Sequence, residues 1–218
     1  MGALGNLLLL ALVVVDLYMV STTRLDACVR ASALQGLVLS ALPFALVAPG
    51  SGTSSRDLIH LAAIALATLL VKSLLIPGLL LRELRLLGVR REFKPFVSLH
   101  VSQLINGALV GVAFWLAWAL PWPGASADTM GLGSGLATLL VGVYMTINRR
   151  KALSQVLGFL VIESGLVVIG WSLLREPSLI LEIGAMLDVL VAVMVMGVLA
   201  TDLEGVEIDL NGHHEERS

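Results

Sequence analysis

The chain has 218 residues, of which 57% are hydrophobic and 14% are charged, and its mean hydropathy is +0.94. A soluble domain carries about a quarter charged residues, so this composition predicts an integral membrane protein. The formal net charge is −2, and no basic face is paired with exposed aromatic residues, so nucleic-acid binding has no support. The single cysteine, Cys28, excludes a disulfide framework and a thiolate set for zinc or an iron–sulfur cluster.

Seven apolar runs follow one another along the chain, and each can cross a bilayer as a helix of about 20 residues. Continuous apolar segments satisfy their backbone hydrogen bonds in lipid only as helices, so we predict an all-α fold of about seven transmembrane helices. The second run reaches adequate length when it is extended back towards Cys28. The runs are Ala3–Ser21, Ala33–Val47, Leu58–Leu81, Phe96–Leu120, Thr129–Ile147, Leu153–Leu174 and Leu179–Thr201.

The charges of the loops alternate along the chain, and every second loop is basic. Basic residues follow the first run, lie between Arg82 and Lys94, and form Arg149-Arg150-Lys151 after the fifth run. Basic loops face the cytoplasm, so we predict that the N-terminus lies outside and the C-terminus is cytoplasmic. We divide the chain into a four-helix membrane region (1–120), a three-helix membrane region (121–202) and an acidic cytoplasmic tail (203–218).

Ionisable groups inside the apolar runs are the main functional signal. Each costs a few kcal/mol at the bilayer centre, and such residues mark ion or proton pathways in membrane proteins. At a rise of about 1.5 Å per residue, Lys72 and Asn106 lie roughly 13 Å from the cytoplasmic ends of their runs, Glu163 roughly 15 Å and Asp188 roughly 19 Å. Because four different runs contribute groups at a similar depth, we predict a buried polar layer.

Further polar residues extend this predicted layer towards both membrane faces. His100, Gln103 and Asn106 recur every three residues in the fourth run, close to one helix face, and could form a ladder from water to the layer. Gln155 has a similar place at the entry of the sixth run. Glu182 is closer to the outer face than Asp188 and could pass protons outward, or extend its side chain to the interface.

A proton path follows from the effect of burial on titration. A low-dielectric surrounding favours the neutral forms of carboxyl and amine, so both groups can exchange protons, and a neighbouring opposite charge restores the ionised form. In this hypothesis Glu163 and Asp188 titrate, and Lys72 is their charge partner. The alternative is a structural layer, because a single polar bond between membrane helices is worth under about 1 kcal/mol. Asp16, near the inner end of the first run, is predicted to form an interfacial ion pair with Arg24.

Two features of the backbone are expected to matter for packing. Pro77-Gly78 weakens the third helix towards its cytoplasmic end, and freed carbonyls there could bind the Lys72 ammonium. Small residues let helices approach closely, so the glycines of the fifth and sixth runs predict tight packing between them. These glycines are Gly131, Gly133, Gly135, Gly158 and Gly165.

The last three runs carry the strongest likeness to a known family. They contain RRKALSQVLGFLVIESG over residues 149–165, then Glu176-Pro177, then LEIGAMLDVLVAV over residues 181–193, and the third run contains Lys72-Ser-Leu-Leu-Ile-Pro77. The chain resembles, over nearly its whole length, the component E membrane subunit of hydrogenase-4 and related group 4 nickel–iron hydrogenase or formate hydrogenlyase complexes. Its last three runs are similar, more distantly, to the K subunit of complex I and the C subunit of Mrp-type antiporters.

The resemblance implies a non-catalytic subunit of a hetero-oligomeric, complex I-like oxidoreductase in a prokaryotic inner membrane. It implies no cofactor in this chain, with nickel–iron and iron–sulfur centres in a peripheral arm. The implied partners are antiporter-like and H-subunit-like membrane proteins. Glu163 matches the first glutamate of the K-subunit proton path, and Asp188, or else Glu182, supplies the second carboxyl. Two other interpretations remain open, a subunit of a multisubunit cation/proton antiporter and a structural spacer of the membrane arm.

Overall fold

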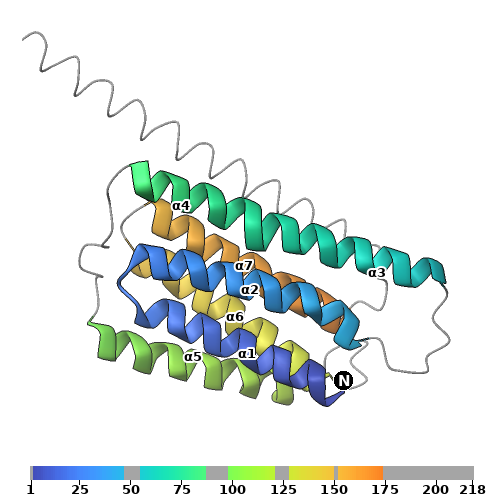
Figure 1. Ribbon diagram of the computed structural model, residues 1–218. Coiled ribbons are helices and arrows are strands. Elements are labelled where there is room, and N and C mark those ends of the chain that lie inside the picture. The colour runs from blue at the N-terminus through green and yellow to red at the C-terminus, as the bar shows by residue number, and fades with distance from the viewer. Residues whose placement is uncertain (1, 47–54, 87–97, 121–127, 150–151, 174–218) are drawn as a thin grey trace, which may run out of the picture.

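The computed structural model of the chain describes residues 2–46, 55–86, 98–120, 128–149 and 152–173. All the secondary structure in these residues is helical, which confirms the predicted all-α class. The elements are α1 (Ala3–Ser21), α2 (Leu25–Leu46), α3 (Ser55–Thr68), the π-helix η1 (Leu69–Leu75), α4 (Ile76–Leu86), α5 (Leu99–Ala119), α6 (Thr129–Asn148) and α7 (Ala152–Leu173). Figure 1 shows α3, η1 and α4 as one continuous helix.

Six helical stretches of the described chain are long and apolar enough to cross a membrane. The chain is therefore a multi-pass membrane protein. The first predicted run and α1 have the same bounds, whereas α2 begins at Leu25, eight residues before the apolar run starting at Ala33. The seventh run, Leu179–Thr201, and the acidic tail lie outside the described residues.

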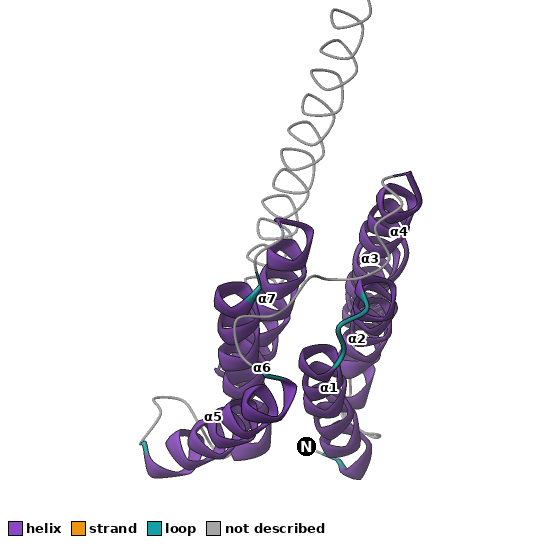
Figure 2. Ribbon diagram, turned by 90° about the vertical axis from the view of Figure 1, so that its left-hand side faces the viewer, coloured by secondary structure: helices purple, strands orange, loops and turns teal. Residues whose placement is uncertain are grey.

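The helices form two layers that face each other (Figure 2). One layer contains α1, α2 and the continuous helix α3–η1–α4, and the other contains α5, α6 and α7. Across the interface, α1 packs on α5 and α6, and α2 packs on α7. Successive helices run in opposite directions, so α1 and α6 finish at the same end of the bundle, where α7 begins (Figure 1). We call this the Arg149 end.

Two of the three apolar clusters in the described residues lie towards opposite ends of the interior. One lies towards the Arg149 end and includes Met19, Cys28 and Val161, and the other lies towards the opposite end and includes Leu9, Leu39 and Val168. Along α2 and α7, the polar residues Gln35 and Glu163 fall between members of the two clusters. Apolar packing therefore bounds the polar interior of the bundle on both sides and limits the access of water to it.

Tight packing between α6 and α7 depends on glycine, as the sequence predicted. A Cβ atom on Gly165 would lie 2.6 Å from the backbone nitrogen of Leu139, and one on Gly142 would lie 2.6 Å from that of Ile162. Real Cβ atoms do not approach backbone atoms so closely, so a side chain at either position would push the helices apart. This closely packed pair of helices carries Glu163.

Candidate functional site in the bundle interior

Lys72 and Glu163 meet in the interior of the bundle. Lys72 belongs to η1 and Glu163 to α7, and the distance from Lys72 Nζ to Glu163 Oε1 is 3.0 Å. The side chains are 6% and 2% exposed, so water does not screen the pair. A carboxylate and an ammonium in contact stabilise each other's charged form, which offsets the cost of removing both from water.

Lys72 lies in the middle of a π-helix, and the sequence explains why the helix changes there. Pro77 has no backbone N–H and cannot donate to the carbonyl of Ser73, one turn earlier. The chain adopts wider turns instead, and the Ile76 N–H donates to the Val71 carbonyl, five residues back. Single π-turns inside α-helices occur often at functional sites. Pro77 predicted a weakened helix in the right place, but not the π-helix itself.

Helix α2 passes very close to the backbone of Lys72. A Cβ atom on Gly36 would lie 2.9 Å from the carbonyl carbon of Lys72 and 3.0 Å from its oxygen. Because backbone atoms cannot move aside as a flexible side chain can, only glycine fits at this position without a shift of η1. Gly36 thus sets the distance between α2 and the residue that carries the ammonium.

Asp16 forms a second polar contact, and the predicted ion pair with Arg24 is wrong. Asp16 is 0% exposed, and its Oδ1 accepts a hydrogen bond of 2.6 Å from Gln35 Nε2 of α2. Thr138 of α6 lies beside the same carboxyl. Arg24 is exposed beyond the end of α1, whereas Asp16 shares the buried face of α1 with Leu12 and Met19.

Arg149, counted from the sequence as a residue of a basic loop, is buried at the C-terminus of α1. Its Nη2 donates to the carbonyls of Met19 at 2.7 Å and Thr22 at 3.3 Å, and its Nη1 donates to Cys28 Sγ at 3.5 Å. The last carbonyls of a helix carry partial negative charge, which favours a cation there. The arginine therefore joins α6 to the α1–α2 turn. No sequence signal distinguished it from Arg150 or Lys151.

The proposed ladder residues of α5 lie in different surroundings. His100 and Gln103 are exposed, and Gln103 Nε2 donates to Ser21 Oγ of α1 at 2.8 Å. Asn106 is 0% exposed, and its Nδ2 donates to the Ser102 carbonyl of its own helix at 2.7 Å. Figure 2 shows α5 and α3–η1–α4 at opposite edges of the two layers, so Asn106 and Lys72 share a depth but not a cluster.

The remaining candidates are placed as follows. Gln155 is partly buried and donates from Nε2 to the Arg149 carbonyl at 3.3 Å. Asp188 and Glu182 lie outside the described residues. Within the described ranges, no group of three or more His, Cys, Asp or Glu side chains is arranged to hold a metal ion.

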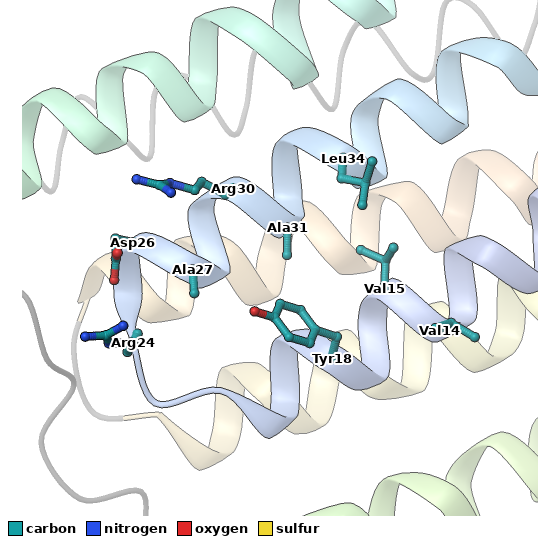
Figure 3. A pocket seen from close by; sticks show the side chains of 9 residues that line it. All are labelled: Val14, Val15, Tyr18, Arg24, Asp26, Ala27, Arg30, Ala31 and Leu34. Atoms are coloured by element: carbon teal, nitrogen blue, oxygen red, sulfur yellow. The ribbon is translucent and has the colours of Figure 1, made fainter.

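A groove of about 530 Å³ opens between α1 and α2 on the outer face of their layer (Figure 3). Tyr18, Arg24, Asp26 and Arg30 lie at its end near the α1–α2 turn, and its other lining residues are apolar. Tyr18 and Leu34 are about half exposed. The groove therefore belongs to the surface of the bundle, separate from the two buried carboxyls.

Comparison with known proteins places the chain in a family. No family model matches it, and no solved structure matches it. The chain is 32% identical over 196 residues to "Uncharacterized protein Rv0085" of Mycobacterium tuberculosis strain H37Rv, and the match covers 89% of this chain and 86% of that protein. An identity of this size over nearly the full length of both proteins shows common descent, so the chain belongs to the family of Rv0085.

Proposed function

We propose that this chain is a non-catalytic membrane-arm subunit of a complex I-like energy-converting hydrogenase or related oxidoreductase, and that it provides part of a proton path. The observation that supports this proposal most directly is the buried contact between Lys72 and Glu163, which are 3.0 Å apart among the six apolar helices of the described residues. Ionisable pairs inside membrane spans are costly and mark proton or ion pathways. The likeness of the sequence to hydrogenase-4 component E supports the type of parent complex.

The pair can act as a relay because its two members control each other's charge. When a proton binds to a Glu163 oxygen, the carboxyl becomes neutral and the Lys72 ammonium loses its opposite charge. At an effective dielectric constant of about 20, two charges about 4 Å apart interact by about 4 kcal/mol, so this loss is large. A charge that moves along the polar interior can therefore switch the pair between a paired and an unpaired state.

The location of the pair suits such a relay. Lys72 sits in a π-helix, where the backbone departs from regular α-helical bonding, and Glu163 sits on α7, which glycine contacts hold against α6. One partner is thus on a π-helix, and the other is on a helix that is closely packed against its neighbour.

In this proposal the chain crosses a prokaryotic inner membrane seven times, with its N-terminus outside and its C-terminus cytoplasmic. Asp188, or else Glu182, of the seventh span receives the proton from Glu163. His100, Gln103, Asn106 and Gln155 supply water or protons from the cytoplasmic face. Antiporter-like and H-subunit-like membrane subunits bind alongside, and a peripheral arm contains the nickel–iron and iron–sulfur centres.

The test is proton translocation by sealed membrane vesicles that contain the parent complex. Glu163→Gln keeps the shape of the side chain and removes its titration, so we expect proton uptake to fall to the level of vesicles without this chain while the redox activity of the soluble arm persists. Asp26→Asn, at the surface groove, is the matched control and should leave translocation unchanged. Normal translocation by the Glu163→Gln complex would overturn the proposal.

Purification in mild detergent distinguishes the possible parent complexes. Co-purification of this chain with hydrogenase-like subunits supports the proposed function. If antiporter subunits alone accompany the chain and transport depends on sodium, the chain belongs to a cation/proton antiporter. If Glu163→Gln prevents assembly and leaves the transport of the remaining complex intact, the polar interior is a structural spacer.

A further inference from the structure

Asp16 is a buried carboxyl to which the proposed relay assigns no role. It is 0% exposed, and three helices surround it, since α1 packs on α2, α5 and α6. Its Oδ1 is bonded to Gln35 Nε2 at 2.6 Å. Its Oδ2 and Thr138 Oγ1 are both buried, and within the described residues neither atom forms a hydrogen bond of good geometry. A hydrogen bond between these two oxygens would therefore satisfy both of them.

Among the described residues, Asp16 has no cationic partner. Within the described part of the chain, no lysine, arginine or histidine forms an ion pair with this carboxyl, and the side chains that meet it from α2 and α6 are Gln35 and Thr138. The only titratable residue of α5 is His100, which is exposed at its first turn. The other titratable residues of α2 and α6 are Asp26, Cys28, Arg30 and Tyr144.

A neutral carboxylic acid satisfies this site better than a carboxylate. A buried carboxylate with no cation costs so much free energy that the group takes up a proton instead. With a proton on Oδ2, the new O–H donates to Thr138 Oγ1 while Oδ1 still accepts from Gln35. Every polar atom of the carboxyl can then be bonded. An ionised Asp16 would have the Gln35 amide and the Thr138 hydroxyl as donors, but no cation beside it among the described residues.

We infer that Asp16, Gln35 and Thr138 form a second proton-binding site, in which Asp16 Oδ2 carries the proton. Asp16 lies five residues before the end of α1, so it is roughly 8 Å from the Arg149 end, less deep than Lys72 or Glu163. Gln35 is followed by Gly36, which contacts the Lys72 backbone. Helix α2 thus touches both sites with consecutive residues, and a proton entering from the Arg149 end reaches Asp16 first.

Infrared difference spectroscopy of the full-length chain in lipid nanodiscs tests proton binding directly. A protonated carboxyl has a carbonyl stretch distinct from that of a carboxylate, and the band shifts in D₂O. We expect the wild type to show this band at neutral pH, and Asp16→Asn to lose it while keeping a Gln35 partner and a normal fold. Thr138→Val should shift the band, and Asp26→Asn should leave it unchanged. A folded Asp16→Asn variant that retains the whole band would overturn the inference.

The role of this site in a proton path rests on the proposed function. Proton transport by vesicles distinguishes a failure of this role from a failure of the proposed function. If Glu163→Gln and Asp16→Asn both abolish translocation, Asp16 is part of the path. If Glu163→Gln abolishes it and Asp16→Asn has no effect, the proposed function stands and the step through Asp16 is wrong. If neither variant has an effect, the proposed function is wrong, and the infrared band alone decides whether Asp16 binds a proton.

Discussion

Two buried carboxyls close to α2 differ in the partner that each has. Glu163 contacts an ammonium at 3.0 Å, whereas Asp16 accepts a hydrogen bond from an amide at 2.6 Å. Their side chains are equally protected from water. The comparison teaches that burial alone does not set the state of a carboxyl, because a cation in contact favours its charged form, whereas a buried carboxyl without a cation favours its neutral form.

The two sites also differ in their backbones. Lys72 lies in a π-helix that is followed by a proline, and a glycine of α2 contacts its backbone. Asp16, Gln35 and Thr138 lie in regular α-helices. Irregular backbone inside a membrane protein is tolerated where neighbouring protein surrounds it. Substitutions at the Lys72–Glu163 pair should therefore have larger effects than substitutions at the Asp16 site.

The largest effect is expected when the charged pair loses one member. Lys72→Met leaves the Glu163 carboxyl without its ammonium partner, and breaking a buried ion pair in this way costs about 3–5 kcal/mol. The measurement is the unfolding of the purified chain by SDS in mixed micelles. The double variant Lys72→Met with Glu163→Leu should regain most of the stability, since it removes both charges of the pair. A loss below about 1 kcal/mol for Lys72→Met would show that the pair is not held in its charged form.

A smaller effect is expected from a methyl group added between α2 and η1. Gly36→Ala places a Cβ atom against the Lys72 backbone, and overpacking of this kind costs about 1–3 kcal/mol. Gly107→Ala on α5 is the matched control, because no atom lies within 4 Å of the added Cβ. The SDS midpoint of the control should equal that of the wild type. Equal midpoints for both variants would contradict the close approach of α2 to η1.

The neutral site should respond less than the charged pair. Gln35→Leu leaves Asp16 Oδ1 without its donor, which costs about 1–2 kcal/mol for a buried acceptor in a membrane bundle. Asp16→Asn keeps an acceptor oxygen and should cost less than Gln35→Leu. The same SDS titration measures both variants. If Gln35→Leu is as damaging as Lys72→Met, Asp16 carries a charge and the contrast between the two sites fails.

The smallest effect is expected at the edge of the bundle. Gln103→Ala removes a hydrogen bond to Ser21, but Gln103 is exposed and Ser21 also donates to the Leu17 carbonyl. A bond of this kind between membrane helices is worth about 0.6 kcal/mol. Its loss should leave the SDS midpoint almost unchanged. A large loss of stability would mean that α5 depends on this contact for its position.

Much of the fold could be predicted from the sequence because hydropathy along the chain fixes the length of a membrane helix. The bounds of α1, α6 and α7 follow the apolar runs within one or two residues. Glu163 and Lys72 were also found from the sequence, since a charge inside an apolar run is visible without knowing its neighbours. Their common depth predicted a polar layer, but depth carries no information about which helices are adjacent.

The position of Asp16 could not be predicted for the same reason. Helix α1 is apolar on all sides, so its few polar residues do not define the face that packs inward. Arg24 is close to Asp16 in sequence, whereas Gln35 and Thr138 are brought to it by the folding of α2 and α6. The burial of Arg149 depends in the same way on the C-terminus of α1, which is distant in sequence.

The sequence by itself determined that the chain is a helical membrane protein with rare ionisable groups inside its spans, because transfer of each segment into lipid depends mainly on its own residues. The tertiary structure alone decided that Glu163 faces an ammonium and Asp16 an amide. These partners come from other helices, and close packing around Gly36 and the π-helix sets which side chains meet.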